Sequence, residues 1–123
     1  MTIFRLHVKK LFDGQSYIDD QVLTISDGKI IAFDSNTSEV DDVLEGFVVP
    51  GFIDLQVNGG GGALFNDSPS LKNIQTIITA HSKFGTTAML PTLITDKITV
   101  MEKAADAMAE AIAEKVPGII GIH

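Results

Sequence analysis

The spacing of apolar residues changes at Pro50, and this change restricts the possible folds more than any other feature of the chain. Before Pro50, short segments alternate apolar with polar residues, and the turn pairs Asp13-Gly14 and Asp27-Gly28 separate them. After Pro50, apolar runs alternate with segments in which apolar residues recur at helical spacing. The sequence therefore predicts a small β domain over 1–49 and an α/β region over 50–123.

Residues 2 to about 49 are predicted to form a small antiparallel sheet. Asp-Gly between β-rich segments is a strong hairpin signal. The strand candidates cover 4–11, 21–25 and 29–33, and the polar tract over 34–39 is expected to be an exposed loop.

After Pro50 the predicted order is strand, helix, strand, helix, strand. The strand candidates are 52–58, then 86–94 with Pro91 near its end, and then 119–123. Strands that alternate with helices of this length imply a parallel sheet with right-handed crossovers. Because the last strand is also the last element, the sheet would keep an unpaired edge, and the chain is expected to be an incomplete domain.

The two helices have recognisable start signals and apolar stripes. Ser68 is the expected N-cap of the first helix, with Pro69 at its first position, and Asp96 is the expected cap of the second. The predicted stripes are Leu71, Ile74, Ile77, Ile78 and His81 in the first helix and Ile98, Met101, Ala104, Ala105, Met108, Ala111 and Ile112 in the second.

Composition excludes several classes of function. The chain has 123 residues, no cysteine and a net charge of −7. It therefore has no thiolate metal site, and its charge argues against nonspecific binding to nucleic acid or anionic lipid, which needs clustered Lys and Arg. No apolar run approaches the ~20 residues of a membrane helix. A cytoplasmic protein without a nucleic-acid or membrane partner is the expectation.

A row of polar residues marks the first strand after Pro50. If side chains alternate there, Asp54, Gln56 and Asn58 share one face. Buried amides and carboxylates need partners, and at the carboxyl end of a parallel strand such groups often belong to an active site. An ordinary polar strand end is the other reading, and the pattern leaves both open.

Glycines 59–62 follow this strand directly. A phosphate-binding loop would need a Lys followed by Ser or Thr, and a helix that starts at the glycines. Neither is present, so a tight turn or a close backbone approach is the favoured interpretation.

The three histidines are dispersed along the chain. His7 and His81 are interpreted as structural residues, with His81 as a favourable charge or cap at the end of its helix. His123 stands at the carboxyl end of a predicted parallel strand, where catalytic residues concentrate. It is therefore a candidate site residue.

The run Val48-Val49-Pro50-Gly51-Phe52-Ile53-Asp54, preceded by Asp27-Gly28-Lys29-Ile30-Ile31, resembles the amidohydrolase superfamily. Most members follow this Asp with His-x-His, whereas this chain has Gln56-Val57-Asn58. That substitution and several further motifs resemble the N-acetylglucosamine-6-phosphate deacetylase family. The further motifs are Asn58-Gly59-x-Gly61-Gly62, Phe65-Asn66, Gly85-Thr86-Thr87, Leu90-Pro91-Thr92-Leu93-Ile94-Thr95 and Gly121-Ile122-His123.

The resemblance implies an α/β chain in which a small β-sandwich-like N-terminal domain precedes the first two to three βα units of a truncated (β/α)8 TIM-type barrel. It implies hydrolysis of N-acetylglucosamine 6-phosphate to glucosamine 6-phosphate and acetate, in amino-sugar catabolism. The implied cofactor is a divalent metal ion, zinc or iron, and the implied partners are the small amino-sugar phosphate and a second subunit in a homodimer.

The resemblance also implies the site residues. Gln56 and Asn58 occupy the position of the superfamily His-x-His, and with His123 they line the active site. Carboxamides are weak neutral ligands, so a single-metal mechanism is expected. The family pattern continues as His-x-Glu-Gly-Pro, so the metal ligands and the catalytic Asp are expected downstream, and this chain alone is expected to be inactive.

Two alternatives stay open at this point. The first is another amidohydrolase that acts on a cyclic amide or deaminates a base. The second is a non-catalytic module built on half a barrel.

Overall fold

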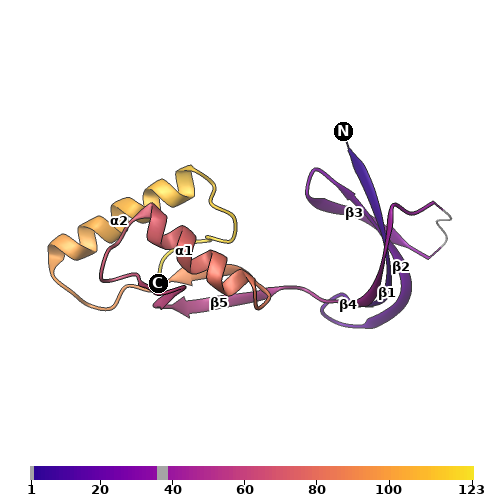
Figure 1. Ribbon diagram of the computed structural model, residues 1–123, viewed down its shortest axis with the longest axis horizontal. Helices are drawn as coiled ribbons and strands as arrows, with labels where there is room; N and C mark the ends of the chain where they lie inside the picture. Colours follow the sequence, from indigo (N-terminus) through magenta and orange to yellow (C-terminus); the bar gives the residue numbers. More distant parts are fainter. Residues whose placement is uncertain (1, 36–38) are drawn as a thin grey trace. The chain divides into compact units, whose positions relative to one another are not determined.

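A computed structural model describes residues 2–35 and 39–123 (Figure 1). Contacts divide the chain into two units, with the boundary between Pro50 and Gly51. The first, here unit 1, contains strands only, and the second, unit 2, contains both helices. Part of the predicted loop over 34–39 lies outside the described residues.

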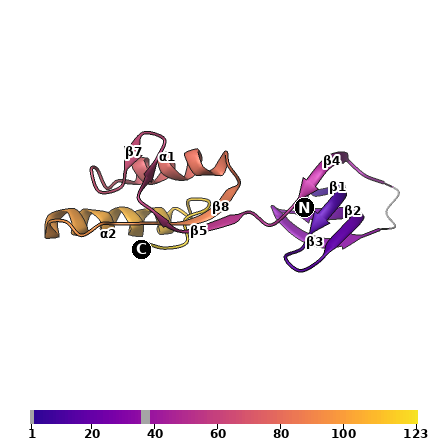
Figure 2. The same cartoon turned by 90° about the horizontal axis from the view of Figure 1, so that it is seen from below.

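Unit 1 is a four-stranded sheet in the order β3-β2-β1-β4 (Figure 2). The strands are β1 (Ile3–Phe12), β2 (Tyr17–Ser26), β3 (Lys29–Asp34) and β4 (Asp42–Val48). Both predicted hairpins are present. The Asp13 carboxylate accepts from the backbone N–H groups of Gln15 and Ser16 at 2.8 Å, and Asp27 and Gly28 take the positive φ values that a tight β turn requires.

Two expectations for unit 1 are wrong. The sheet is mixed, because β4 pairs with β1 in the parallel direction, and its described residues form one sheet rather than a sandwich. β4, the next strand along the chain after β3, lies on the other side of β1 from β2. Register shifts between Val8 and Lys10 and between Thr24 and Ile25 add local bends, and this single sheet buries Val8, Leu11 and Leu23.

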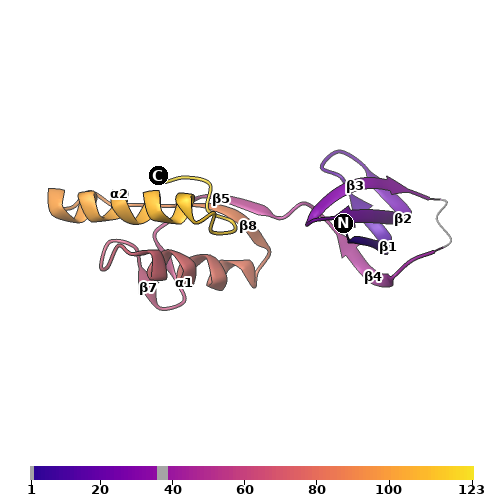
Figure 3. The ribbon, with the colours of Figure 1, turned by 90° about the horizontal axis from the view of Figure 1, so that it is seen from above.

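Unit 2 is built on two parallel strands, β5 (Phe52–Val57) and β8 (Thr86–Pro91). The helices are α1 (Leu71–Ser82) and α2 (Ile98–Ala113), and β6 (Gly59–Gly60) with β7 (Ala63–Leu64) forms a small hairpin. Both helices share one core with the strand residues Val57 and Met89. Figure 3 shows α1 and α2 running beside each other. β8 ends at Pro91, earlier than the predicted end of this strand at residue 94, and Pro91 stands at its end as expected. The α/β class of the chain is therefore confirmed.

The first helix buries its predicted stripe but starts later than predicted. Ile74, Ile77 and Ile78 are buried. The N-cap is Ser70, whose side chain accepts from the Asn73 backbone, and not Ser68. The reason is that Ser70 Oγ and Asn73 Nδ2 both donate to the Ser68 carbonyl, which holds Ser68 in a turn ahead of the helix.

The second helix also departs from the prediction. Its N-cap is Lys97, without a side-chain cap bond, because Asp96 is used elsewhere. The buried face is Ala104, Ala107, Met108 and Ala111, whereas the predicted Ile98, Met101, Ala105 and Ile112 are exposed. Small alanines let α2 approach the core closely, so the helix turns its alanine face inward.

Residues 119–123 run beside β8 but do not form the predicted continuous strand. Ile119 makes an isolated parallel bridge with Met89. His123 donates its N–H to Pro91 and accepts from Leu93, so it lies opposite Thr92. The four residue steps from Ile119 to His123 therefore match three steps from Met89 to Thr92, and a bulge interrupts the ladder. No helix among the described residues is long and apolar enough to span a membrane.

Replacing Ile77 by alanine is expected to lower the free energy of unfolding of unit 2 by about 2–5 kcal/mol, because Ile77 is fully buried. Ile112→Ala is the matched control, since Ile112 is 55% exposed and its loss should cost within about 0.5 kcal/mol. Both helices belong to unit 2, so helical circular dichroism during denaturant unfolding follows this unit. Equal effects of the two variants would contradict the assigned core.

Candidate functional site

The candidate site lies where β5, β8 and residues 119–123 end. These three segments run parallel, so their carboxyl ends meet at one edge, here the strand-end edge. The predicted residues Gln56, Asn58 and His123 all belong to it. Gln56 is exposed near the end of β5, half-buried Asn58 follows that strand, and His123 is exposed beside the end of β8.

A bulge alters β5 just before its end. Asp54 pairs with Met89 and Val57 pairs with Pro91, so Leu55 and Gln56 together oppose one residue of β8. The predicted strict alternation is wrong across this bulge. Val57 is buried while Ile53 and Leu55 are exposed, although regular alternation would place all three on the face opposite Asp54, Gln56 and Asn58. A bulge redirects side chains, and such features are common beside active sites.

The bulge gives His123 a backbone partner. Its Nδ1 lies 3.0 Å from the carbonyl oxygen of Leu55. Because a carbonyl can only accept, Nδ1 carries a proton, and in the neutral ring Nε2 keeps its lone pair. The structure therefore brings His123 next to the bulge that contains Gln56. An acceptor nitrogen beside an amide can orient a polar group of a ligand.

Backbone bonds hold Asn58 on both sides. Its own carbonyl accepts from Phe65 N–H at 2.8 Å, and the carbonyl of the preceding Val57 accepts from Thr92 N–H at 2.8 Å. Phe65 and Val57 are both buried in the core. The side chain of Asn58 thus starts from a backbone that is fixed on the β5 side and on the β8 side.

The glycines after Asn58 pack against α1. A Cβ at Gly60 would lie 2.8 Å from the His81 ring, and a Cβ at Gly61 would lie 3.1 Å from the Thr76 side chain. Gly61 and Gly62 also have positive φ values. These glycines therefore allow a close backbone approach and a turn, as the sequence favoured.

His81 lies in the last turn of α1 and has a structural role, as predicted, but its side chain does not cap the helix. Its Nε2 lies 3.0 Å from the carbonyl oxygen of Gly59, so Nε2 is protonated and the ring holds the glycine hairpin against α1. His7, interpreted as structural, has its Nε2 3.4 Å from Asp20 Oδ1 in unit 1.

Asn66 connects the two loops that leave the strand-end edge. Its Oδ1 accepts from Ile94 N–H at 2.9 Å, and its Nδ2 donates to the Ile94 carbonyl at 2.8 Å and to Asp96 Oδ2 at 3.1 Å. The bond from Asn66 and a second one from Lys97 N–H lower the pKa of Asp96. The sequence placed Asn66 in a motif but gave no role to it or to the His81 contact, because both depend on partners far along the chain.

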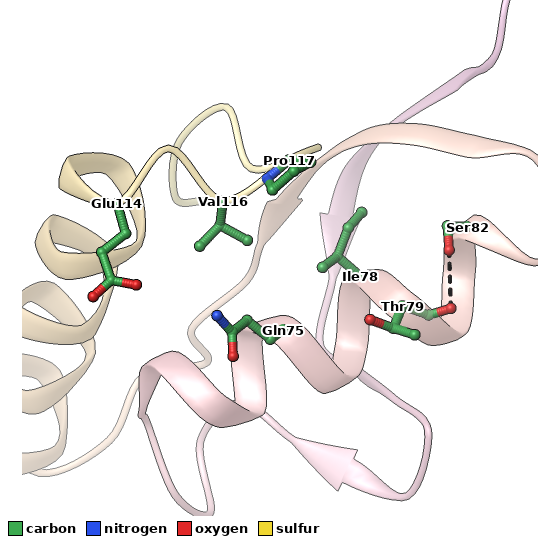
Figure 4. Close-up of a pocket in the computed structure, with 7 residues that line it drawn as sticks. All are labelled: Gln75, Ile78, Thr79, Ser82, Glu114, Val116 and Pro117. Atoms are coloured by element: carbon green, nitrogen blue, oxygen red, sulfur yellow. Dashed lines mark hydrogen bonds between the residues drawn. The ribbon is translucent and has the colours of Figure 1, made fainter.

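A groove of unit 2 lies elsewhere. About 540 Å³ in volume, it opens between the carboxyl-terminal parts of the helices (Figure 4) and is lined by Gln75, Ile78, Thr79, Ser82, Glu114, Val116 and Pro117. The hydrogen bond drawn within it joins Ser82 Oγ to the Thr79 carbonyl inside α1. With a single carboxylate and no histidine, this groove offers no acid–base pair.

The chain is similar to amino-sugar-phosphate deacetylases. No protein-family model matches it. It is 64% identical over 78 residues to the N-acetylgalactosamine-6-phosphate deacetylase of Shewanella sp. (strain ANA-3), covering 63% of this chain and 20% of the relative. It is 37% identical over 73 residues to the N-acetylglucosamine-6-phosphate deacetylase of Haemophilus influenzae, covering 59% of this chain and 19% of the relative.

A solved structure gives the same likeness. N-acetylglucosamine-6-phosphate deacetylase from Pasteurella multocida matches with a TM-score of 0.85 and 25% identity, over 99% of this chain and 34% of that chain. The resemblance inferred from the motifs is therefore confirmed. The chain spans only about a fifth of the length of the curated relatives.

His81→Ala is expected to loosen the glycine hairpin, because the half-buried Gly59 carbonyl would lose its partner at a cost of about 1–3 kcal/mol. Hydrogen exchange of the Phe65 amide should become faster. His7→Ala, in unit 1, is the control and should leave this amide unchanged. Unaltered exchange in His81→Ala would contradict the assigned role.

The neutral rings of His123 and His81 are expected to be opposite tautomers. The bond to Leu55 requires a proton on Nδ1 of His123, whereas the bond to Gly59 requires one on Nε2 of His81. NMR spectra of the ring nitrogens distinguish the two forms in one sample. The same tautomer at both positions would rule out one of the two hydrogen bonds.

Proposed function

We propose that this chain forms the N-terminal part of a deacetylase that hydrolyses the acetamide of an N-acetylated hexosamine 6-phosphate. The observation that carries the proposal is the 64% identity over 78 residues to a deacetylase of this kind. The polar residues at the strand-end edge support it, because they stand where parallel α/β folds bind ligands. The relatives are much longer, so the activity is proposed for a protein that includes more than these residues.

We propose residues 1–49 as the small β domain and residues 50–123 as the start of a (β/α)8 barrel. The β5-α1-β8-α2 order, with parallel strands, supports this reading. Apolar side chains of β5 are left uncovered, with Phe52 at 68% and Leu55 at 61% exposure. A barrel of ~250 residues would cover such side chains with its remaining strands.

Gln56, Asn58 and His123 are proposed to line the active site. Gln56 and Asn58 supply amide donors and acceptors, and His123 supplies an acceptor nitrogen at Nε2. These groups can bind and orient the hydroxyl and acetamide groups of a sugar. Holding Asn58 from both sides would fix that orientation before the ligand arrives.

The residues described here do not by themselves fit a tightly held metal ion. Residues 2–35 and 39–123 contain no cluster of three or more His, Cys, Asp or Glu that could hold one. The amide oxygens of Gln56 and Asn58 are weak ligands. A zinc or iron ion, which the resemblance implies, would therefore be held by residues outside this chain.

The identity of the sugar has two candidates. The sequence motifs resemble the N-acetylglucosamine-6-phosphate family, whereas the relative with 64% identity is named for the galacto epimer. These sugars differ in the orientation of one hydroxyl group. N-acetylgalactosamine 6-phosphate is therefore the second candidate substrate, and both sugars should be assayed side by side.

The remaining expectations concern partners and location. A small amino-sugar phosphate is the proposed ligand, and a homodimer in the cytoplasm is the proposed state of the whole enzyme. Size-exclusion chromatography coupled to light scattering would test the dimer.

Acetate release from both sugar phosphates is the direct test. The protein translated from the complete reading frame, loaded with zinc or iron, should release acetate from at least one of them, and the 123-residue chain should release none. Asn58→Ala in the longer protein should lower kcat/KM by about 5- to 150-fold, because a bond of about 1–3 kcal/mol is lost.

Gln75→Ala is the control for that variant. Gln75 carries a side-chain amide but lines the groove between the helices, so its loss should leave kcat/KM unchanged. Turnover of cyclic amides or bases without acetate release would favour a different amidohydrolase. No turnover of any of these substrates by the metal-loaded protein would favour the non-catalytic module.

A further inference from the structure

We propose that Asn66 is a positioning residue that locks the loop after β5 to the loop after β8, and thereby fixes the backbone that carries Asn58. Its importance for catalysis rests on the proposed function. The lock itself is a property of this chain and can be tested without a substrate.

The Asn66 side chain bonds Ile94 as a neighbouring β-strand would, because its amide pairs with both the N–H and the carbonyl of that residue. Asn66 Oδ1 accepts from Ile94 N–H while Nδ2 donates to the carbonyl of the same residue. The second Nδ2 hydrogen is donated to Asp96 Oδ2. Both donors of the amide and one acceptor are therefore used, and an amide is the group that offers this combination.

The backbone next to Asn66 is fixed by the residue that precedes it. The preceding Phe65 is fully buried, and its N–H donates to the Asn58 carbonyl. On the other loop, Thr92 lies two residues before Ile94, and its N–H donates to the Val57 carbonyl. The Thr92 and Ile94 contacts thus join the β8 loop to segments on either side of Asn58. Loss of the Asn66 bonds would remove the Ile94 contact and leave only the Thr92 contact between the two loops.

Asp96 extends the lock to α2. Its Oδ2 accepts a hydrogen bond from Asn66 Nδ2, and its Oδ1 accepts one from Lys97 N–H at 2.7 Å. Lys97 is the N-cap of the helix. The Asn66 bond is the main cause that lowers the pKa of Asp96, followed by the Lys97 N–H and the Lys97 charge. A carboxylate at position 66 would face Asp96 and repel it.

The test compares Asn66→Ala, Asn66→Asp and the control Asn73→Ala by NMR of the 123-residue chain. Asn73 also uses its amide on a backbone carbonyl, that of Ser68, but lies in α1. In Asn66→Ala, the Ile94 amide should exchange about tenfold faster or more, and the Asn58 amide signal should shift. Asn73→Ala should change neither.

A pH profile separates the lock from simple loss of packing. The stabilisation from the hydrogen bond between Asn66 and the Asp96 carboxylate is fully present above the ordinary carboxyl pKa of 3.8. It is lost only as pH falls through the lowered pKa of Asp96. In Asn66→Asp, two carboxylates face each other at neutral pH, so the Ile94 protection factor should be low. It should rise as one of them takes up a proton on acidification, the reverse of the wild-type trend.

Wild-type protection of Ile94 in Asn66→Ala would overturn the proposal, and so would faster exchange without any shift at Asn58. A flat pH profile in Asn66→Asp would also overturn it. These measurements use no substrate. The lock can therefore fail while the deacetylase assay succeeds, and the assay can fail while the lock is found.

Discussion

The parallel pairing of β5 with β8 is the constraint on which the rest of unit 2 depends. Two parallel neighbours cannot be joined by a tight turn, so the chain between them must cross over one face of the sheet. The crossover helix α1 meets this requirement by burying Ile74 and Ile77 against Met89. Because the strands then point the same way, both loops that follow them leave from one edge, and polar residues far apart in the sequence become neighbours.

Irregularities at that edge create the site. In the interior of a regular parallel sheet, the backbone N–H and C=O groups pair with the neighbouring strands and successive side chains point to opposite faces. The bulge at Leu55 and Gln56 leaves a carbonyl for His123, the glycine hairpin lets the chain turn within contact distance of His81, and Asn66 supplies strand-like bonds where the strands have ended. Each departure places a polar group where regular structure would have placed none.

The sequence predicted the elements of this fold better than their partners. Apolar periodicity and Asp-Gly turns identify strands and helices because these signals are local. The parallel alignment of β4 with β1, the inward alanine face of α2 and the His81–Gly59 bond depend on what lies across space, so no local pattern reveals them. Ser70 is the N-cap of α1 instead of Ser68, because hydrogen bonds from the Ser70 hydroxyl and the Asn73 amide to the Ser68 carbonyl hold Ser68 in a turn ahead of the helix. Gln56, Asn58 and His123 were candidates from their positions at predicted strand ends, and the family resemblance added a role for them; the structure places them at one edge, and their role stays a prediction.

The bond between His123 and Leu55 joins residues 68 positions apart. The pairing of β5 with β8 and the backbone bonds of His123 to Pro91 and Leu93 already bring these two residues together, so the bond itself adds only the energy of one exposed hydrogen bond. The apolar core of unit 2, in contrast, buries side chains from both helices and both parallel strands. Partial unfolding should therefore dissolve the candidate site while the helices stay packed, so retained helical content is no guarantee that the site residues remain assembled.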